Sequence, residues 1–157
     1  EPTGKDWHIG RNPTPTSLKR YKSIPPGGNR FDLPVALTPD CWKRKKTGST
    51  DVFGRLKWDA PSLTIRTEFF KPEKGCYLHP QAHRPITIRE AARLQTFPDK
   101  YVFIGSNVQV AKQIGNAVPC RLAYAVGKEL FQLLNPSAYS VQNETVDRLA
   151  PLQRQLA

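Results

Sequence analysis

The stretch RPITIREAARLQTFPDKYVF, Arg84 to Phe103, predicts a short helix with a defined start and a defined end. Thr87 is followed three residues later by Glu90, which is the spacing of a capping box. We therefore expect the helix to run from about Ile88 to Gln95. The Thr-Phe-Pro sequence that follows ends it, because proline disfavours helical backbone in the residue before it.

Two more helices are expected after this stretch. The first runs from about Asn107 to Ile114 and is closed by Gly115. The second is PCRLAYAVGKELFQLLN, with Pro119 in its first turn and Asn135-Pro136 at its end. Apolar residues recur along it at helical spacing and predict one apolar face, made by Leu122, Val126, Leu130 and Leu133. Residues 136 to 157 are weakly patterned and predict at most one frayed helix.

The sequence before this part is of a different kind. Thr14 to Pro34 is so rich in turn formers that we expect an irregular, loop-rich segment. Leu63 to Phe70 alternates and is rich in β-branched and aromatic residues, which predicts a strand paired across a turn with Gly75 to Pro80. The expected fold class is therefore α+β, with domains over residues 1–80 and 81–135 and a weakly structured tail over 136–157.

The charge of the chain favours a polyanionic partner. The 157 residues carry a formal net charge of +11, with a pI near 9.9. Nucleic acid fits this charge better than a membrane, because the sequence has no long apolar span and no basic amphipathic helix. The chain also lacks methionine and begins at Glu1, from which we expect a piece of a longer protein.

A basic stretch with interspersed aromatic residues, Cys41 to Asp59, is a candidate for nucleic-acid contact. Its Lys and Arg side chains suit phosphates, and Trp42, Phe53 and Trp58 could stack on bases. The alternative is that these aromatic side chains belong to the core and the lysines form a solvated rim.

The cysteines and histidines predict no metal site. Cys41, Cys76 and Cys120 are odd in number and far apart, with no CxxC pair and no histidine at metal-ligand spacing. They predict no disulfide framework either. The histidines are scattered, and a surface or structural role is expected for each of His8, His79 and His83.

The turn QIGNAVPC, Gln113 to Cys120, offers two candidate residues. Cys120 lies near a predicted helix start, a position at which thiols can be reactive, but no nearby His or Lys is spaced to act as its base. We therefore do not expect a nucleophile here. Asn116 follows a helix-ending glycine, and its side chain either caps the next helix or exchanges hydrogen bonds with a polar ligand.

Two blocks taken together resemble the DNA (cytosine-5)-methyltransferase family. Arg84 to Phe103 followed by QIGNAVPCRLAYAVGKEL, Gln113 to Leu130, is similar to the last two sequence blocks of that family in their usual order and separation. FGRLKWDAPSLTIRTEFFKPEKGCYLHP, Phe53 to Pro80, resembles the end of the target-recognition domain in bacterial restriction-modification members, where a Thr followed by an aliphatic residue, here Thr64-Ile65, recurs. The resemblance covers about residues 53 to 131.

Three blocks of the family do not occur in this sequence. They are the glycine-rich turn that binds S-adenosylmethionine, the Pro-Cys-Gln loop whose cysteine attacks cytosine C6, and the Glu-Asn-Val block that engages the base. Pro119-Cys120 is followed by Arg121 and does not match the catalytic loop. The resemblance thus implies base flipping and methyl transfer to cytosine C5 by the complete enzyme, with no catalytic residue in this chain and no activity from it alone.

The resemblance also implies roles for three groups of residues. The region up to about residue 80 would read the target sequence in double-stranded DNA, through Lys57, Thr64, Arg66 and Thr67. The scaffold of that domain would be formed by the segment that begins at Arg84 and ends at Pro98, and Arg89, Glu90 and Arg93 would orient it through ion pairs. The final block would complete the cofactor pocket of a Rossmann-like domain, with S-adenosylmethionine beside Asn116, Ala117 and Val118.

Two functions remain open on the sequence. The chain either supplies recognition and cofactor-pocket closure to a cytosine-5 methyltransferase, or is a stand-alone DNA-binding or regulatory module. In the first case the partners are double-stranded DNA and a catalytic domain or subunit with the missing blocks, in a bacterial cytoplasm at the nucleoid. Both hypotheses predict DNA binding that weakens steeply with salt.

Overall fold

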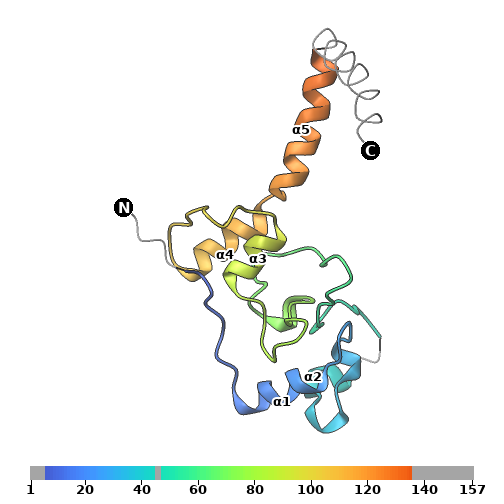
Figure 1. Ribbon diagram of the computed structural model, residues 1–157. Helices are drawn as coiled ribbons and strands as arrows, with labels where there is room; N and C mark the ends of the chain where they lie inside the picture. The colour runs from blue at the N-terminus through green and yellow to red at the C-terminus, as the bar shows by residue number, and fades with distance from the viewer. Residues whose placement is uncertain (1–5, 45–46, 136–157) are drawn as a thin grey trace, which may run out of the picture. The chain divides into compact units, whose positions relative to one another are not determined.

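A computed structural model describes residues 6 to 44 and 47 to 135. The chain forms two compact units, Glu1–Pro119 and Cys120–Ala157. Within the described ranges the regular elements are helices (Figure 1). The α-helices are α1 (Pro15–Ser23), α2 (Asp40–Lys43), α3 (Ile88–Leu94), α4 (Asn107–Asn116) and, in the second unit, α5 (Cys120–Leu134). The short 3-10 helices are η1 (Arg30–Asp32), η2 (Val35–Leu37) and η3 (Pro72–Lys74).

The expectation of an α+β fold with a partly β recognition domain is wrong for the described residues. They contain no strand, and their β-type pairing is limited to isolated bridges of Leu78 with Arg55 and with Pro85. The same residues contain no sheet of a Rossmann-like domain.

The expected strand from Leu63 to Phe70 does not form because a side chain and a turn take its backbone hydrogen bonds. The Tyr77 hydroxyl accepts a hydrogen bond from the Arg66 N–H and donates one to the Thr64 carbonyl, both at 3.1 Å. The Phe69 N–H then closes a turn on the Arg66 carbonyl at 3.2 Å. The β-type composition of this segment therefore reflects the burial of its apolar side chains rather than a strand ladder.

The expected partner strand, Gly75 to Pro80, bonds to a different segment. The Leu78 N–H donates to the Gly54 carbonyl at 2.9 Å, and the Leu56 N–H donates to the Leu78 carbonyl at 3.0 Å. The turn expected at residues 71 to 74 contains η3. The predicted hairpin is thus replaced by a short pairing between segments more than twenty residues apart.

The segment Thr14 to Pro34 is more ordered than its composition indicates. The Thr14 hydroxyl accepts a hydrogen bond from the Ser17 N–H at 3.2 Å, and Pro15 occupies the first helical position of α1. The prediction of an irregular, loop-rich segment did not include α1, because Thr and Pro are turn formers in composition but here are the residues that start a helix.

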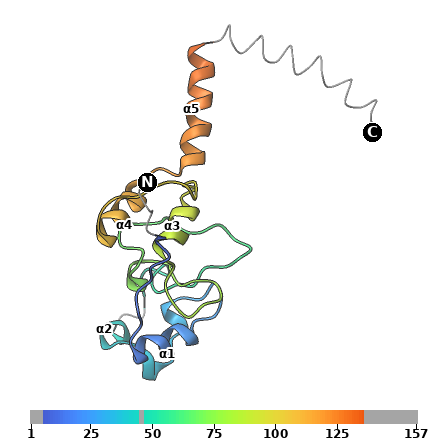
Figure 2. The same ribbon diagram turned by 60° about the vertical axis from the view of Figure 1, so that its left-hand side comes forward.

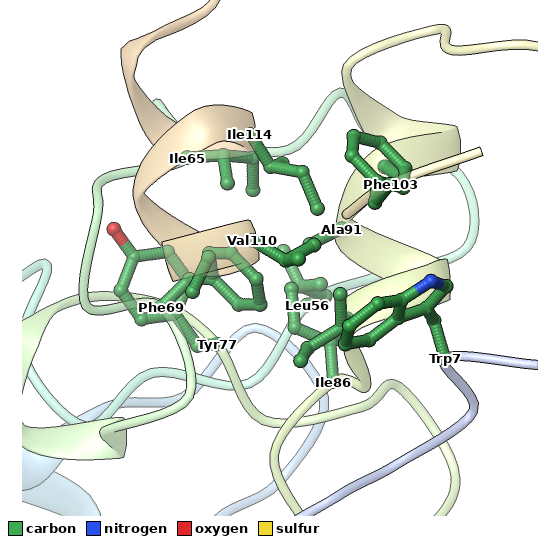
Figure 3. Packing of buried hydrophobic residues seen from close by; sticks show 13 residues of the cluster. Trp7, Leu56, Ile65, Phe69, Tyr77, Ile86, Ala91, Phe103, Val110 and Ile114 are labelled. Carbon is green, nitrogen blue, oxygen red and sulfur yellow. The ribbon is translucent and has the colours of Figure 1, made fainter. Parts of the chain in front are cut away.

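Both helices predicted before residue 117 are confirmed, and they build the main core. α3 has the expected capping box of Thr87 and Glu90, and α4 continues one residue beyond Gly115. The two helices lie side by side in both views (Figures 1 and 2). Figure 3 shows side chains of both meeting apolar residues from the loops. The buried members of this core include Trp7, Leu56, Ile65, Phe69, Tyr77, Ile86, Ala91, Phe103, Val110 and Ile114.

A second, smaller core lies around α1. Its buried members are Tyr21, Ile24, Leu33, Phe53 and Leu78. Trp42 packs against it edge-on to Phe53, with ring centroids 5.5 Å apart. Core membership is therefore the correct interpretation for Phe53 and Trp42, whereas Trp58 is exposed.

The second unit contains α5, the last predicted helix, which begins at Cys120, one residue after the predicted start at Pro119. The four residues of its predicted apolar face, Leu122, Val126, Leu130 and Leu133, are 50% to 75% exposed. The frayed helix expected after residue 135 lies outside the described residues.

Candidate functional site

The first turn of α3 carries a forked ion pair. The Arg84 guanidinium donates two hydrogen bonds of 2.8 Å, one to each carboxylate oxygen of Glu90. The Thr87 N–H donates to the same carboxylate at 2.8 Å. Two parallel bonds fix the relative orientation of guanidinium and carboxylate, so the chain entering α3 is held to the helix by side chains as well as by its cap.

This arrangement keeps Glu90 ionised. Burial would raise the pKa of its carboxyl, but the hydrogen bonds from Arg84 and Thr87 and the positive charge of Arg84 hold that pKa at about 2. The same pair raises the pKa of Arg84. Glu90 in the folded protein therefore stays charged at neutral and mildly acidic pH.

The Glu90 pair predicts a pH-dependent contribution to stability. A carboxyl whose pKa is lowered on folding stabilises the protein above the unfolded pKa of 4.5, and that contribution is lost as the pH falls toward the folded pKa of about 2. We expect Glu90→Gln to lower the free energy of unfolding at neutral pH by about 1–3 kcal/mol. In urea titrations the difference from the unmodified chain should be constant above pH 4.5 and shrink below it.

The control for this variant is Arg89→Gln. The Arg89 guanidinium makes one exposed hydrogen bond, to the Asp99 carbonyl at 3.1 Å, so its loss should change the free energy of unfolding by less than about 0.5 kcal/mol. An effect of Glu90→Gln that is equally large at pH 2 and pH 7 would show that packing, and not the charge, is responsible.

The remaining scaffold candidate, Arg93, also has an intramolecular partner. Its guanidinium donates to both carboxylate oxygens of Asp99, at 2.7 and 3.0 Å. Asp99 therefore connects both arginines of α3, Arg89 through its carbonyl and Arg93 through its carboxylate, to the loop after the helix. The scaffold roles expected of these residues remain predictions.

Two clefts lie beside α3. One has a volume of about 420 Å³ and is lined by the segment around Lys57 and Trp58 together with His79, Glu90 and Arg93. The other, of about 600 Å³, is lined by residues 60 to 65 and by the end of α4. Both clefts share Ala60, Ser62 and Leu94, so the segment after Trp58 borders each of them.

Two of the four residues expected at DNA line these clefts, one in each. Lys57 is exposed and lines the first cleft. Thr64 is exposed and lines the second cleft together with Ala117, which was expected beside the cofactor. The structure thus places one DNA candidate and one cofactor candidate in a single cleft.

The other two DNA candidates are engaged within the protein. The Arg66 guanidinium pairs with the Asp51 carboxylate at 2.9 Å and donates to the Lys74 carbonyl at 3.1 Å. Thr67 is half-buried, and its backbone lies against Gly115 of α4. Binding of DNA by Arg66 would require it to exchange an exposed ion pair for a phosphate or a base.

The cofactor candidates lie where α4 ends. Asn116 is its last residue and is exposed, Ala117 is half-buried, and Val118 is 60% exposed. An exposed primary amide can both donate and accept hydrogen bonds. The Asn116 side chain could therefore bind a polar group of a ligand, whether that group is a donor or an acceptor.

Gln95 is a site residue that the sequence reasoning missed. Its buried side-chain amide donates to the Ile114 and Ala117 carbonyls, both at 3.0 Å, and so fixes the end of α4 to α3. The signal was present, since Gln95 lies seven residues after Ile88 and four after Ala91, on the buried face of the helix. A polar residue in such a position needs a buried partner.

Comparison with known proteins identifies the family. Residues 12–132 match the model of C-5 cytosine-specific DNA methylases. The type II methyltransferase M.PspPI of Psychrobacter sp. (strain TA137) is 43% identical over 122 residues, which are 75% of this chain and 29% of the relative. M.Eco47II of Escherichia coli is 44% identical over 116 residues, 71% of this chain and 27% of the relative. Mouse DNA (cytosine-5)-methyltransferase 1 is 43% identical over 88 residues, 55% of this chain and 5% of the relative.

The match is strong in identity and partial in length. The chain spans less than a third of the length of these relatives. Among the helices in the described ranges, none combines the length and the apolar character needed to cross a bilayer. Because the family match covers most of the 157 residues, the chain belongs to the C-5 cytosine-specific DNA methylase family.

Proposed function

We propose that this chain supplies DNA recognition and one side of the cofactor pocket to a cytosine-5 DNA methyltransferase of the restriction-modification type. The observation that carries the proposal is a family match over residues 12–132 in a sequence without the Pro-Cys-Gln and glycine-rich blocks. Those blocks would come from another domain or subunit. The assembled enzyme would transfer a methyl group from S-adenosylmethionine to cytosine C5 in double-stranded DNA, in a bacterial cytoplasm at the nucleoid.

The end of α4 supports the cofactor role. Gln95 ties the carbonyls of Ile114 and Ala117 to α3, while Asn116 between them is exposed. A ligand-binding residue needs a fixed backbone and a free side chain, and Asn116 has both. We propose that its amide binds a polar group of S-adenosylmethionine and that Ala117 and Val118 contact the cofactor through apolar surface.

The charge and the exposed loops support the DNA role. The chain is strongly basic, and Lys57 and Thr64 are exposed on the segment after the buried Leu56. We propose that residues up to about 80 form the DNA-reading part, with Lys57, Thr64, Arg66 and Thr67 at phosphates or base edges.

Reconstitution tests the proposed function. Mixing the chain with a catalytic polypeptide that carries the missing blocks should restore methylation of cytosine in duplex DNA. Asn116→Ala should raise the dissociation constant for S-adenosylmethionine in the mixture about tenfold, as expected for one lost hydrogen bond of about 1.4 kcal/mol. Calorimetry with the cofactor alone measures this without turnover.

Two controls accompany the reconstitution. DNA binding by the isolated chain should not change in Asn116→Ala, and Asn12→Ala, which removes another exposed amide, should leave cofactor affinity unchanged. A folded mixture that binds DNA but neither binds cofactor nor methylates would favour the stand-alone DNA-binding module instead.

A further inference from the structure

The cleft beside Trp58 has an arrangement that the proposed roles do not use. Trp58 is 75% exposed although it is a large aromatic residue. Its ring lies nearly perpendicular to the His79 imidazole, with an interplanar angle of 85° and ring centroids 5.5 Å apart. The indole is therefore supported on one side while most of its surface faces solvent.

His79 is fixed by its own turn. Its Nδ1 accepts hydrogen bonds from the N–H groups of Gln81 and Ala82, at 3.1 and 2.9 Å. An atom that accepts two bonds carries no proton, so the proton lies on Nε2, which is 3.8 Å from a Glu90 oxygen. Burial lowers the pKa of His79 and favours the same neutral form. Trp58 thus packs against an imidazole of fixed orientation and tautomer.

The charges around the cleft leave a cation at its edge. Glu90 is neutralised by Arg84, and Arg93 is neutralised by Asp99. Lys57, adjacent to Trp58 in the chain, is exposed and lines the same cleft. An exposed aromatic ring beside a cation is the combination that binds single nucleotides of an unstacked strand.

We propose that Trp58 and Lys57 form a platform for one nucleotide displaced from the duplex stack. The base stacks on the exposed indole surface, and the adjoining phosphate pairs with the Lys57 ammonium. The platform rests on the proposed DNA-recognition function and adds to it a specific ligand, an unstacked nucleotide. Enzymes that flip a base necessarily create unstacked positions in the bound DNA, so a basic chain of this family has such a ligand within reach.

Binding to two matched duplexes tests the platform. One duplex carries a single bulged thymidine, and the other carries an abasic bulge at the same position. Trp58→Ala should weaken binding to the first duplex about tenfold, because stacking of one base on an aromatic side chain has an effect of about this size. Binding to the abasic duplex should change less than twofold, and Trp58→Phe should retain most of the affinity.

Two further variants complete the experiment. Lys57→Gln should weaken binding to both duplexes and reduce the slope of log affinity against log salt by about one. Tyr124→Ala removes an aromatic side chain of α5 that is 74% exposed and should change neither affinity.

The outcomes separate the platform from the function on which it rests. If Trp58→Ala binds both duplexes as well as the unmodified chain does, or binds both more weakly by the same factor, the platform is overturned and the DNA-recognition proposal stands. If Trp58→Ala binds DNA normally but no longer associates with the catalytic polypeptide, the cleft is a protein contact and the platform is also overturned. A chain that binds no DNA at all contradicts both proposals.

Discussion

Arg55→Met should lower the free energy of unfolding of the first unit by about 3 kcal/mol. Arg55 is only 3% exposed, and among the described residues its guanidinium donates hydrogen bonds to four backbone carbonyls and to no carboxylate. The bonds to Ile24 and Tyr21 are 2.8 and 2.5 Å long, and those to His79 and Ala82 are 2.5 and 3.0 Å. Methionine fills a similar volume, so the variant removes the donors with little change in packing.

The size of this effect is decided by two opposing contributions. Burial disfavours the charged guanidinium and lowers the pKa of Arg55, so methionine relieves part of a desolvation cost. Against this, the Ile24 and His79 carbonyls lose the Arg55 donor, while the Tyr21 and Ala82 carbonyls keep a backbone N–H. Each buried group left unsatisfied costs about 1–3 kcal/mol. The second contribution is larger because one guanidinium joins carbonyls of two segments, Tyr21 to Ile24 and His79 to Ala82, and carbonyls are acceptors that cannot bond to one another.

Urea denaturation of Arg55→Met should be compared with Arg66→Met. Arg66 is an exposed arginine with one ion pair, to Asp51, and its replacement should change the free energy of unfolding by less than about 1 kcal/mol. A loss in Arg55→Met no greater than in Arg66→Met would show that the four carbonyls find other donors. Hydrogen exchange should also show earlier opening at α1, because Tyr21 and Ile24 lose their connection to the loop near residue 80.

Arg55 also illustrates what the sequence could not predict about the fold. The helices α3, α4 and α5 were predictable because their signals are local: a cap, an apolar period and a stop within a few residues. In the first eighty residues the backbone pairs across long separations, such as Gly54 with Gly75 at 3.2 Å. In the sequence, Arg55 is indistinguishable from the basic residues around it, and only these long-range pairings bury it.

The candidate site shows the same division. The capping box of Thr87 and Glu90 was predictable from spacing. An ion pair of Glu90 was expected, but its partner, Arg84, was not. Trp58 was expected in the core rather than at a stacking position, but composition does not decide which aromatic residue of a segment is exposed. The approach of α4 to the backbone of Arg66 and Thr67 could not be predicted at all, because it joins segments with no local relation.

That approach predicts that Gly115→Ala destabilises the protein, although alanine is normally the better helix residue by about 1 kcal/mol. A Cβ at Gly115 would lie 2.5 Å from the Arg66 carbonyl carbon and from the Thr67 Cα. These are backbone atoms that cannot rotate away, so α4 must shift. We expect a loss of about 2–3 kcal/mol in urea denaturation, the usual range for overpacking a tight contact.

Gly127→Ala is the matched control, because Gly127 also lies in a helix and a Cβ there would meet no atom within 4 Å. This variant should raise the helix content by circular dichroism and leave the unfolding midpoint of the first unit unchanged. The displacement in Gly115→Ala should also affect function, because Asn116 follows directly and Ala117 is held by Gln95 at 3.0 Å. Cofactor affinity in the reconstituted enzyme should therefore fall together with the free energy of unfolding in Gly115→Ala. If both alanine variants instead stabilised their helices equally, α4 would not contact the backbone of Arg66 and Thr67 closely.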